Sequence, residues 1–383
     1  MRTSDVFIAI VGNELFGIPL DLPQGVVINE AALFAVAKKH ALSHLLIGPI
    51  ERNDITIKDE RLLEQMMKAA KTAIRKEAVM KHVFEEIKEI FVSNGIDYAP
   101  LKGIRIKSLY PDGWMRSSCD LDILIKESDL ERATAALVAA GFETDNVKNY
   151  HDVSFYYHNV NLELHFSVKE NIEKFDKVLA EADKHLVNVG DHEYAEDNEF
   201  FIYHVVAHTA YHFLSGGCGV RSICDLKFLL EKTTFDKDKL DAMLLRGGLK
   251  VFFERLKDLC GVWFGNEDTN ETVEEMKRFI IMGGAFGSGK NSVSMHLARE
   301  KKGKLGYILK LTFLPYDNMC ELYPSLRGKK LLLPFYYVFR IFSKLFLKSG
   351  KSARKRAKTV VATDRTAHSS LEGLLKQLGL EDN

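Results

Sequence analysis

Residues 101–125, LKGIRIKSLYPDGWMRSSCDLDILI, decide the fold that we predict for this chain. Residues 120–125 alternate as a half-buried strand does, and residues i and i+2 of a strand point to the same face. Asp120 and Asp122 therefore project together, while Leu121 and Ile123 pack behind them. Two like charges held side by side are unfavourable unless a cation lies between them. The pattern favours a metal site, although paired aspartates alone are also common at strand ends.

The residues before this strand add a phosphate-binding element. A short β-rich run over residues 96–101 meets Lys102 and Gly103 and is followed by a helical turn. Glycine lets the backbone approach a ligand, and a helix N-terminus offers free N–H groups to phosphate. We therefore expect a strand, a glycine turn and a helix to precede the paired aspartates.

A third carboxylate follows downstream. Residues 153–157 and 160–166 are β-rich, which predicts an antiparallel hairpin around residues 158–159, and the second strand carries Glu163 between two leucines. Three acidic residues on neighbouring strands beside a phosphate-binding turn suit a site with two metal ions, which clamp the attacking and leaving oxygens of an in-line displacement.

Helical patterns surround this unit. Apolar residues recur at helical spacing over residues 29–40 and 59–94, and the chain becomes helical again after about residue 195. Ser128 to Glu131 forms a capping-box pattern that predicts a helix ending at Gly141. We predict an α+β fold: an N-terminal helical region (1–90), a core with a small mixed sheet (91–195) and a C-terminal helical region with a basic tail (196–383).

The composition is that of an ordinary soluble protein, with 46% hydrophobic and 28% charged residues and no net charge. The five cysteines are widely spaced without a CxxC pair, which argues against a disulfide framework and a structural zinc site. No secretion signal pattern and no run of about 18 apolar residues is present, so we expect a cytoplasmic protein without a transmembrane segment.

The order of these motifs resembles the nucleotidyltransferase core shared with DNA polymerase beta and the kanamycin-type aminoglycoside nucleotidyltransferases. More closely, the chain resembles a bacterial group described as uncharacterised nucleotidyltransferases. That resemblance rests on residues 101–125, on AALVAAGFE and NLELHFSV, and on HVVAHTAYHF, RSICDLKFLL, GGAFG and the YPSLRGKKLLLPFYYVFR tail.

The resemblance implies transfer of a nucleoside monophosphate from an NTP, with ATP favoured, to a hydroxyl or phosphate acceptor. Asp120 and Asp122 would bridge two Mg²⁺ ions, with Mn²⁺ as an alternative, and Glu163 would complete the metal site and help to deprotonate the acceptor. Lys102 and the Gly103 backbone would hold the triphosphate.

One position departs from the superfamily pattern. A second small residue, often serine, usually follows the glycine, and here it is Ile104. The alternative function is therefore a non-catalytic nucleotide- or protein-binding module that retains the fold.

Five further residues complete the candidate site, and each residue or pair has two open interpretations. Arg116 either binds phosphate or holds the aspartate loop as a charge partner, and His165 either orients Glu163 or is an ordinary half-buried histidine. His208 lies in a helical stripe with His204 and His212, more typical of packing over the core than of zinc. Arg221 and Asp225 form either a helix salt bridge or part of the acceptor pocket.

Two C-terminal patterns suggest weaker alternatives. Residues 284–291, GAFGSGKN, approach a P-loop centred on Lys290, but Asn291 replaces the Ser or Thr that reaches magnesium, and a helix rather than a strand precedes them. We therefore predict a glycine-rich helix connection. No carboxylate lies between Glu321 and Asp364, where eleven Lys and Arg occur, so contact with nucleic acid or a membrane surface is a minor alternative to a solvated basic face.

Overall fold

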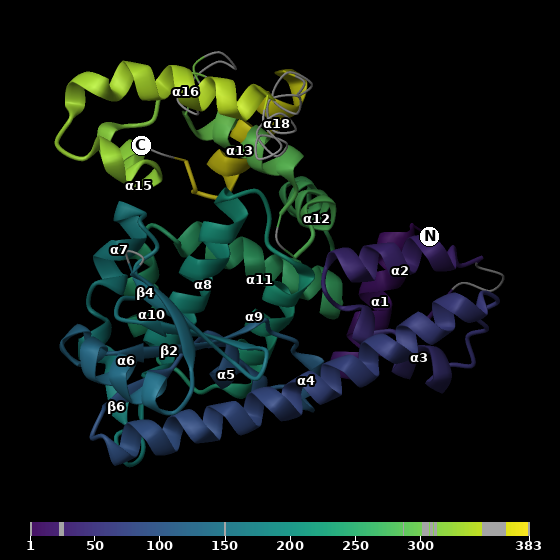
Figure 1. Cartoon of the computed structure of the whole chain (residues 1–383). Coiled ribbons are helices and arrows are strands. Elements are labelled where there is room, and N and C mark those ends of the chain that lie inside the picture. The colour runs from purple at the N-terminus through teal and green to yellow at the C-terminus, as the bar shows by residue number, and fades with distance from the viewer. Residues whose placement is uncertain are drawn as a thin grey trace.

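The computed structural model describes residues 2–22, 27–148, 151–285, 287–300, 306, 309, 312–346 and 365–381. Helices precede and follow a small sheet along the chain, as Figure 1 shows. The N-terminal helices are α1 (Thr3–Phe16), α2 (Glu30–Lys39), α3 (Ile47–Arg52) and α4 (Glu60–Ser93). The architecture is α+β, as the sequence predicts.

Helix α4 connects the N-terminal helices to the sheet. Asp59 caps it by accepting hydrogen bonds from the Arg61 and Leu62 amides. Its 34 residues make a rod of about 50 Å, which runs along the bottom of the molecule in Figure 1. Its second half turns Met80, Val83, Ile87 and Phe91 onto the sheet, since these residues recur on one helical face.

The main sheet has five strands in the order β1-β2-β5-β4-β3. Strands β2 and β5 are parallel, and the other neighbours are antiparallel. The predicted strands are β1 (Tyr98–Pro100), β2 (Asp120–Ile125), β4 (Asp152–Tyr157) and β5 (Val160–His165). The sheet is therefore small and mixed, as expected.

The predicted hairpin is confirmed. Its two connecting residues, His158 and Asn159, have φ values of 48° and 62°, which is typical of the type I′ turn that matches the twist of paired strands.

Three strands were not predicted: β3 (Glu143–Lys148) at the sheet edge and the pair β6 (Leu186–Asn188) and β7 (Tyr194–Glu196). Strand β3 has the sequence ETDNVK, whose residues mostly disfavour strands, and it forms by pairing with the edge of β4.

The capping-box prediction is wrong in detail. Helix α6 (Leu130–Ala139) has Asp129 as its N-cap, preceded by a 3₁₀ turn over Glu127–Asp129. The Asp129 side chain makes no capping bond, because its carboxylate accepts a hydrogen bond from Arg132. Gly141 follows the helix with a φ of 95°, so the predicted end is correct.

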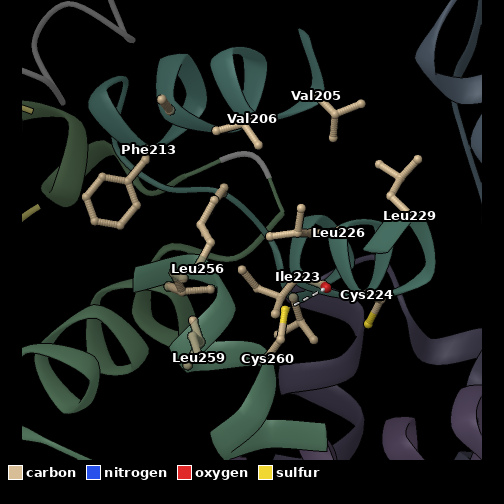
Figure 2. Packing of buried hydrophobic residues seen from close by; sticks show 14 of the residues in the cluster. Val205, Val206, Phe213, Ile223, Cys224, Leu226, Leu229, Leu256, Leu259 and Cys260 are labelled. Atoms are coloured by element: carbon tan, nitrogen blue, oxygen red, sulfur yellow. Dashed lines mark hydrogen bonds between the residues drawn. The ribbon is translucent and has the colours of Figure 1, made fainter. Parts of the chain in front are cut away.

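The C-terminal helices are α8 (Asn198–Leu214), α9 (Val220–Lys232), α10 (Lys237–Arg246), α11 (Lys250–Phe264), α12 (Glu271–Gly283), α13 (Gly289–Glu300), α15 (Tyr316–Leu322), α16 (Leu333–Phe346) and α18 (Arg365–Gln377). Two short helices lie within the sheet unit, α5 (Lys102–Lys107) and α7 (Glu173–Leu179). Helices α8, α9 and α11 form a core that also buries α1, so the two ends of the chain pack together. Figure 2 shows this core, in which the Cys260 thiol donates to the Ile223 carbonyl.

All five cysteines are free thiols, as expected from their spacing. No helix in the described part of the chain is long and apolar enough to cross a membrane.

Candidate active site

The parallel pairing of β2 with β5 brings the predicted carboxylates together. Asp122 is the register partner of Glu163, and Asp120 is the register partner of Asn161. Leu121 and Ile123 are buried behind them, as the alternation requires. The sheet therefore presents three carboxylates on one face from two strands that are distant in sequence.

The three carboxyl groups differ in pKa because of their surroundings. Burial and the charge of Asp122 raise the pKa of Asp120. Burial and the charges of Asp122 and Asp120 raise the pKa of Glu163 to about 7. Asp122 is the exception: burial alone would raise its pKa, but the hydrogen bond and charge of His165 lower it to about 2. Without a cation, the cluster holds one stable anion and two carboxyl groups that resist ionisation.

The donor atoms fit a divalent cation. Ligand atoms of Asp122, Glu163 and His165 lie within 4.8 Å of one another, and His165 Nε2 is 3.4 Å from Asp122 Oδ1. Carboxylate oxygens suit Mg²⁺ and Mn²⁺, and an imidazole adds a ligand that Mn²⁺ accepts more readily than Mg²⁺. Asp120 belongs to neither group of possible ligands in the described residues. The second group, not predicted from the sequence, joins His151 and Asp152 to the same His165.

A cleft of about 330 Å³ lies over these carboxylates. Every residue predicted for the site lines it: Asp120, Asp122, Glu163, Lys102, Gly103, Arg116, His165, His208, Arg221 and Asp225. Helices α8 and α9 supply the wall opposite the sheet, so the histidine stripe of α8 lines the same cleft as the three carboxylates.

Arg116 is buried in an ion pair rather than free in the cleft. Its Nε and Nη2 donate to the two carboxylate oxygens of Asp225, at 2.8 and 2.9 Å. Asp225 also accepts from the Tyr110 hydroxyl at 2.7 Å. This two-pronged contact joins the loop before β2 to helix α9, which corresponds to the charge-partner interpretation of Arg116.

The expected helix salt bridge between Arg221 and Asp225 is therefore wrong. Asp225 turns to Arg116 on the neighbouring loop, and Arg221 donates to the Ser117 carbonyl. The i, i+4 spacing within the helix could not reveal that Arg116, from another segment, would pair with Asp225 instead. Both side chains of Arg116 and Asp225 are buried, so the pair is well shielded from water.

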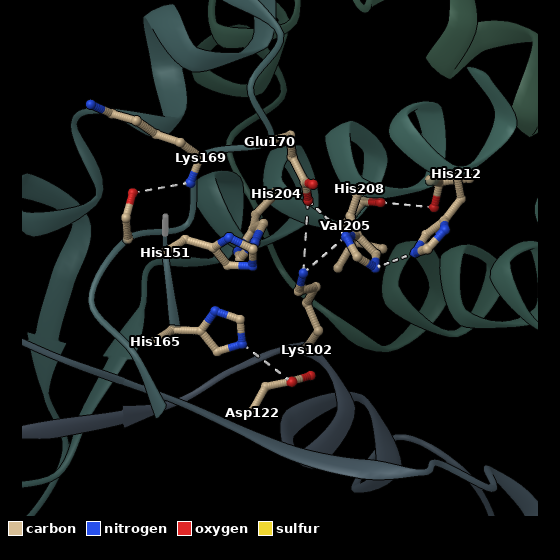
Figure 3. Close-up of polar contacts among 12 residues, drawn as sticks. Lys102, Asp122, His151, His165, Lys169, Glu170, His204, Val205, His208 and His212 are labelled. Atoms are coloured by element: carbon tan, nitrogen blue, oxygen red, sulfur yellow. Dashed lines mark hydrogen bonds and ion pairs between the residues drawn. The ribbon is translucent and has the colours of Figure 1, made fainter. Parts of the chain in front are cut away.

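Lys102 meets a polar cluster on the other wall of the cleft, shown in Figure 3. Its Nζ lies 3.0 Å from His208 Nδ1, which is also 2.7 Å from Glu170 Oε1, while the Nε2 atoms of His208 and His212 are 2.9 Å apart. Burial and the Lys102 charge lower the pKa of His208 to about 3, so its ring is neutral. The Nδ1 atom of a neutral ring can either accept a hydrogen bond from Lys102 or donate one to Glu170, but it cannot do both at once.

Glu170 was missed in the sequence. Burial alone would raise its pKa, but the hydrogen bond with His208 and the Lys102 charge lower it well below the usual range. It lies after β5 in a loop without periodicity, so no pattern marks it. His204 is satisfied separately by Glu196, at 2.8 Å.

Ile104, the residue that departs from the superfamily pattern, does not line the cleft. It packs against the sheet core. Gly103 is less constrained than a turn glycine would be, since an added Cβ would meet only Arg116 Nη1 at 3.5 Å.

The glycine-rich segment near Lys290 is a connection between helices, as predicted. Helix α12 precedes it, and Gly284 ends that helix with a φ of 74°. Asn291 is buried and donates to the Phe279 carbonyl, so it is turned into the helix packing. Phe286 lies outside the described residues, as do the basic residues from Lys348 to Lys358.

Comparison with known families agrees with this geometry. A family model described as "Uncharacterised nucleotidyltransferase" matches residues 27–265, a range that contains the sheet, the carboxylates and both walls of the cleft. No curated protein and no solved structure matches the chain. The match spans more than half of the sequence, and the chain belongs to this nucleotidyltransferase family.

Proposed function

We propose that this nucleotidyltransferase moves a nucleoside monophosphate from an NTP, most readily ATP, to a hydroxyl or phosphate oxygen of an acceptor. The acceptor oxygen forms a bond to the α-phosphorus, the bond between that phosphorus and the α–β bridging oxygen breaks, and pyrophosphate leaves. The single observation that carries this proposal is the register of Asp122 against Glu163 with Asp120 on the same face.

Asp120, Asp122 and Glu163 would hold the divalent cations, two Mg²⁺ ions or Mn²⁺ in their place. Bound cations would offset the triphosphate charge and align the attacking and leaving oxygens. The raised pKa values of Asp120 and Glu163 support this assignment, because a nearby cation is what would let both ionise.

Glu163 has a second proposed role as proton acceptor. It is more exposed than its register partner: 31% of the Glu163 side chain is accessible, against 17% for Asp122. Its side chain lines the cleft beside Asp122, where an acceptor oxygen bound at the cations would lie within its reach. His165, between Asp122 and Glu163, would keep both carboxylates oriented.

Lys102 and the Gly103 backbone are the proposed contacts to the triphosphate. His208 and Glu170 hold the Lys102 Nζ in the cleft, at 3.0 and 3.9 Å, which supports its use as a point charge for phosphate. Arg116 would act by fixing the loop that leads into Asp120, through its pair with Asp225, and Arg221 would line the acceptor side.

The direct test is incubation of the protein with Mg²⁺, isotopically labelled ATP and cell extract, followed by mass spectrometry. The expected product is a compound or protein heavier by one nucleotide, formed by the wild-type chain and absent with Asp122→Asn. Labelled product of equal amount from both proteins would reject the assignment.

A non-catalytic binding module is the second candidate, and Ile104 is the observation that favours it. With a partly buried isoleucine packed against the core at this position, the chain lacks the hydroxyl that often touches the triphosphate in the superfamily. Nucleotide binding in Mg²⁺ without pyrophosphate release, in the presence of extract, would support the module over the enzyme.

A further inference from the structure

Helix α16 has one face packed on the protein and one face whose large apolar side chains are more than half exposed. Leu333, Tyr336 and Tyr337 pack against a small cluster of Met319, Cys320 and Leu326. The Tyr337 hydroxyl donates to the Leu314 carbonyl, and the Arg340 guanidinium donates to the Thr312 carbonyl. These contacts fix how the helix is rotated about its axis.

The opposite face of α16 is apolar and exposed. Phe335, Val338, Phe339 and Phe342 recur at spacings of three and four residues, so they form one stripe along the helix. Their exposures range from 52% to 71%, and Leu331, just before the helix, is 96% exposed. Single exposed apolar residues are ordinary, but a continuous stripe containing three phenylalanines indicates a surface that binds something.

The charged residues on α16 and next to it in the sequence are all basic. The exposed side chains of Arg327, Lys329 and Lys330 precede the helix, and Lys344 lies near its end. No carboxylate occurs in the sequence from residue 322 to residue 363. An apolar stripe bracketed by basic groups is complementary to a surface that is apolar inside and anionic outside.

The length of α16 decides how it could meet such a surface. Its 14 residues span about 21 Å, short of the roughly 30 Å of a bilayer core. The helix is therefore suited to lie in the plane of the interface with its aromatic stripe inserted. In Figure 1 it lies along the top edge of the molecule, on the side away from α4.

Two other covers for the stripe fit less well. The sequence that follows, KSGKSARKRAK over residues 348–358, has only alanine as an apolar residue and cannot replace water on four large side chains. A second copy of the chain would bring the basic groups of two helices together, which is unfavourable.

We propose that the exposed face of α16 (Leu331, Phe335, Val338, Phe339 and Phe342) docks the protein onto an anionic lipid membrane surface. The apolar stripe enters the boundary between headgroups and acyl chains, and Arg327, Lys329 and Lys330 meet the anionic headgroups. The described residues that line the catalytic cleft all lie outside α16, so this docking is separate from the proposed transfer reaction.

Co-sedimentation of the full chain with lipid vesicles tests the proposal. We expect binding to vesicles that contain phosphatidylglycerol and much weaker binding to phosphatidylcholine alone. The double variant Phe335→Ser/Phe339→Ser should reduce binding by at least about tenfold, because two aromatic rings no longer enter the lipid. Lys329→Ala/Lys330→Ala should weaken only the phosphatidylglycerol-dependent part, by about fivefold per lysine at low salt.

Leu245→Ser is the matched control, since Leu245 is 67% exposed on α10 and lies outside the stripe. It should bind vesicles as the wild type does, and circular dichroism should show that all variants remain folded. The proposal is overturned if phosphatidylglycerol vesicles do not bind the wild type, or if the stripe variant binds equally well. Self-association or RNA binding that depends on the stripe, without vesicle binding, would also overturn it.

Discussion

Asp122 on β2 lies directly opposite Glu163 on β5 in a parallel ladder, and their carboxylates share one face of the sheet. The pair is electrostatically unequal. His165 helps to keep the pKa of Asp122 at about 2, whereas burial and the Asp122 and Asp120 charges raise the pKa of Glu163 to about 7. This imbalance gives the metal-free protein measurable properties that a bound cation should change.

Removing the two aspartates should affect stability in opposite directions. In EDTA, Asp120→Asn should stabilise the fold by up to about 1 kcal/mol, because it removes a like-charge repulsion. Asp122→Asn should destabilise it by about 1 kcal/mol, because His165 loses a charged partner. Thermal unfolding in EDTA and in MgCl₂ measures both effects.

The same experiment tests metal binding. The wild type should gain stability from Mg²⁺, and each variant should lose most of that gain. A Mg²⁺-induced rise in melting temperature that survives in both variants would place the cation elsewhere.

The titration of Glu163 should be visible in the pH dependence of stability. Its pKa rises from 4.5 to about 7 on folding, so between these pH values the folded state binds more protons than the unfolded chain. The stability that Glu163 contributes is therefore full below pH 4.5 and is lost as the pH rises through 7.

Comparison with Glu163→Gln isolates this contribution from the other carboxyl groups. In EDTA, the wild type should lose about 1–2 kcal/mol relative to the variant between pH 4.5 and 7, after a discount for its partial exposure. Urea unfolding at a series of pH values gives the two curves. Parallel curves would mean that Glu163 ionises normally and is not crowded by Asp120 and Asp122.

The Arg116–Asp225 ion pair should contribute to the stability of the fold rather than bind nucleotide directly. Arg116→Ala or Asp225→Ala should destabilise the protein by about 3–5 kcal/mol, because each leaves a buried charge without its partner. Glu231→Gln breaks an exposed ion pair with Lys227 on the same helix and should cost less than about 1 kcal/mol. If Arg116→Ala instead left stability unchanged and weakened only nucleotide binding, Arg116 would be a phosphate ligand.

The sequence predicted those parts of the fold that depend on local patterns. DLDILI became β2 with the expected bounds, and residues 158–159 form the tight turn of the expected hairpin. Helix α4 (Glu60–Ser93) fills the run 59–94 in which apolar residues recur at helical spacing. In each case the local preference and the tertiary packing agree.

The features that were missed depend on partners from distant segments. Strand β3 forms because it pairs with β4. Asp225 forms its ion pair with Arg116, although Arg221 is closer to it in the sequence. Glu170 enters the cleft because the chain after β5 passes beside α8, where His208 meets its carboxylate. The spacing of residues within one helix or strand cannot predict such contacts, because it carries no information about which distant segment packs against that helix or strand.

Nucleotide binding should distinguish the cleft from the glycine-rich connection. Lys102→Ala should weaken ATP binding in Mg²⁺ by about tenfold, as expected for the loss of one charge-assisted phosphate contact. Lys290→Ala should leave it unchanged, because Lys290 is exposed at the start of α13. Isothermal titration calorimetry measures both, and the reverse result would favour a P-loop phosphotransferase centred on Lys290.

The most direct test of the central claim is pyrophosphate release by wild type and Glu163→Gln, measured with Mg²⁺, ATP and cell extract as the source of acceptor. The variant keeps the shape of the side chain and removes its charge, so turnover should fall by at least about 10²-fold, a typical contribution of a general base. Binding of a non-hydrolysable ATP analogue in Mg²⁺ should persist, because Asp120 and Asp122 remain. Pyrophosphate release at the wild-type rate would contradict the account, because the third carboxylate of the site would then have to be a residue other than Glu163.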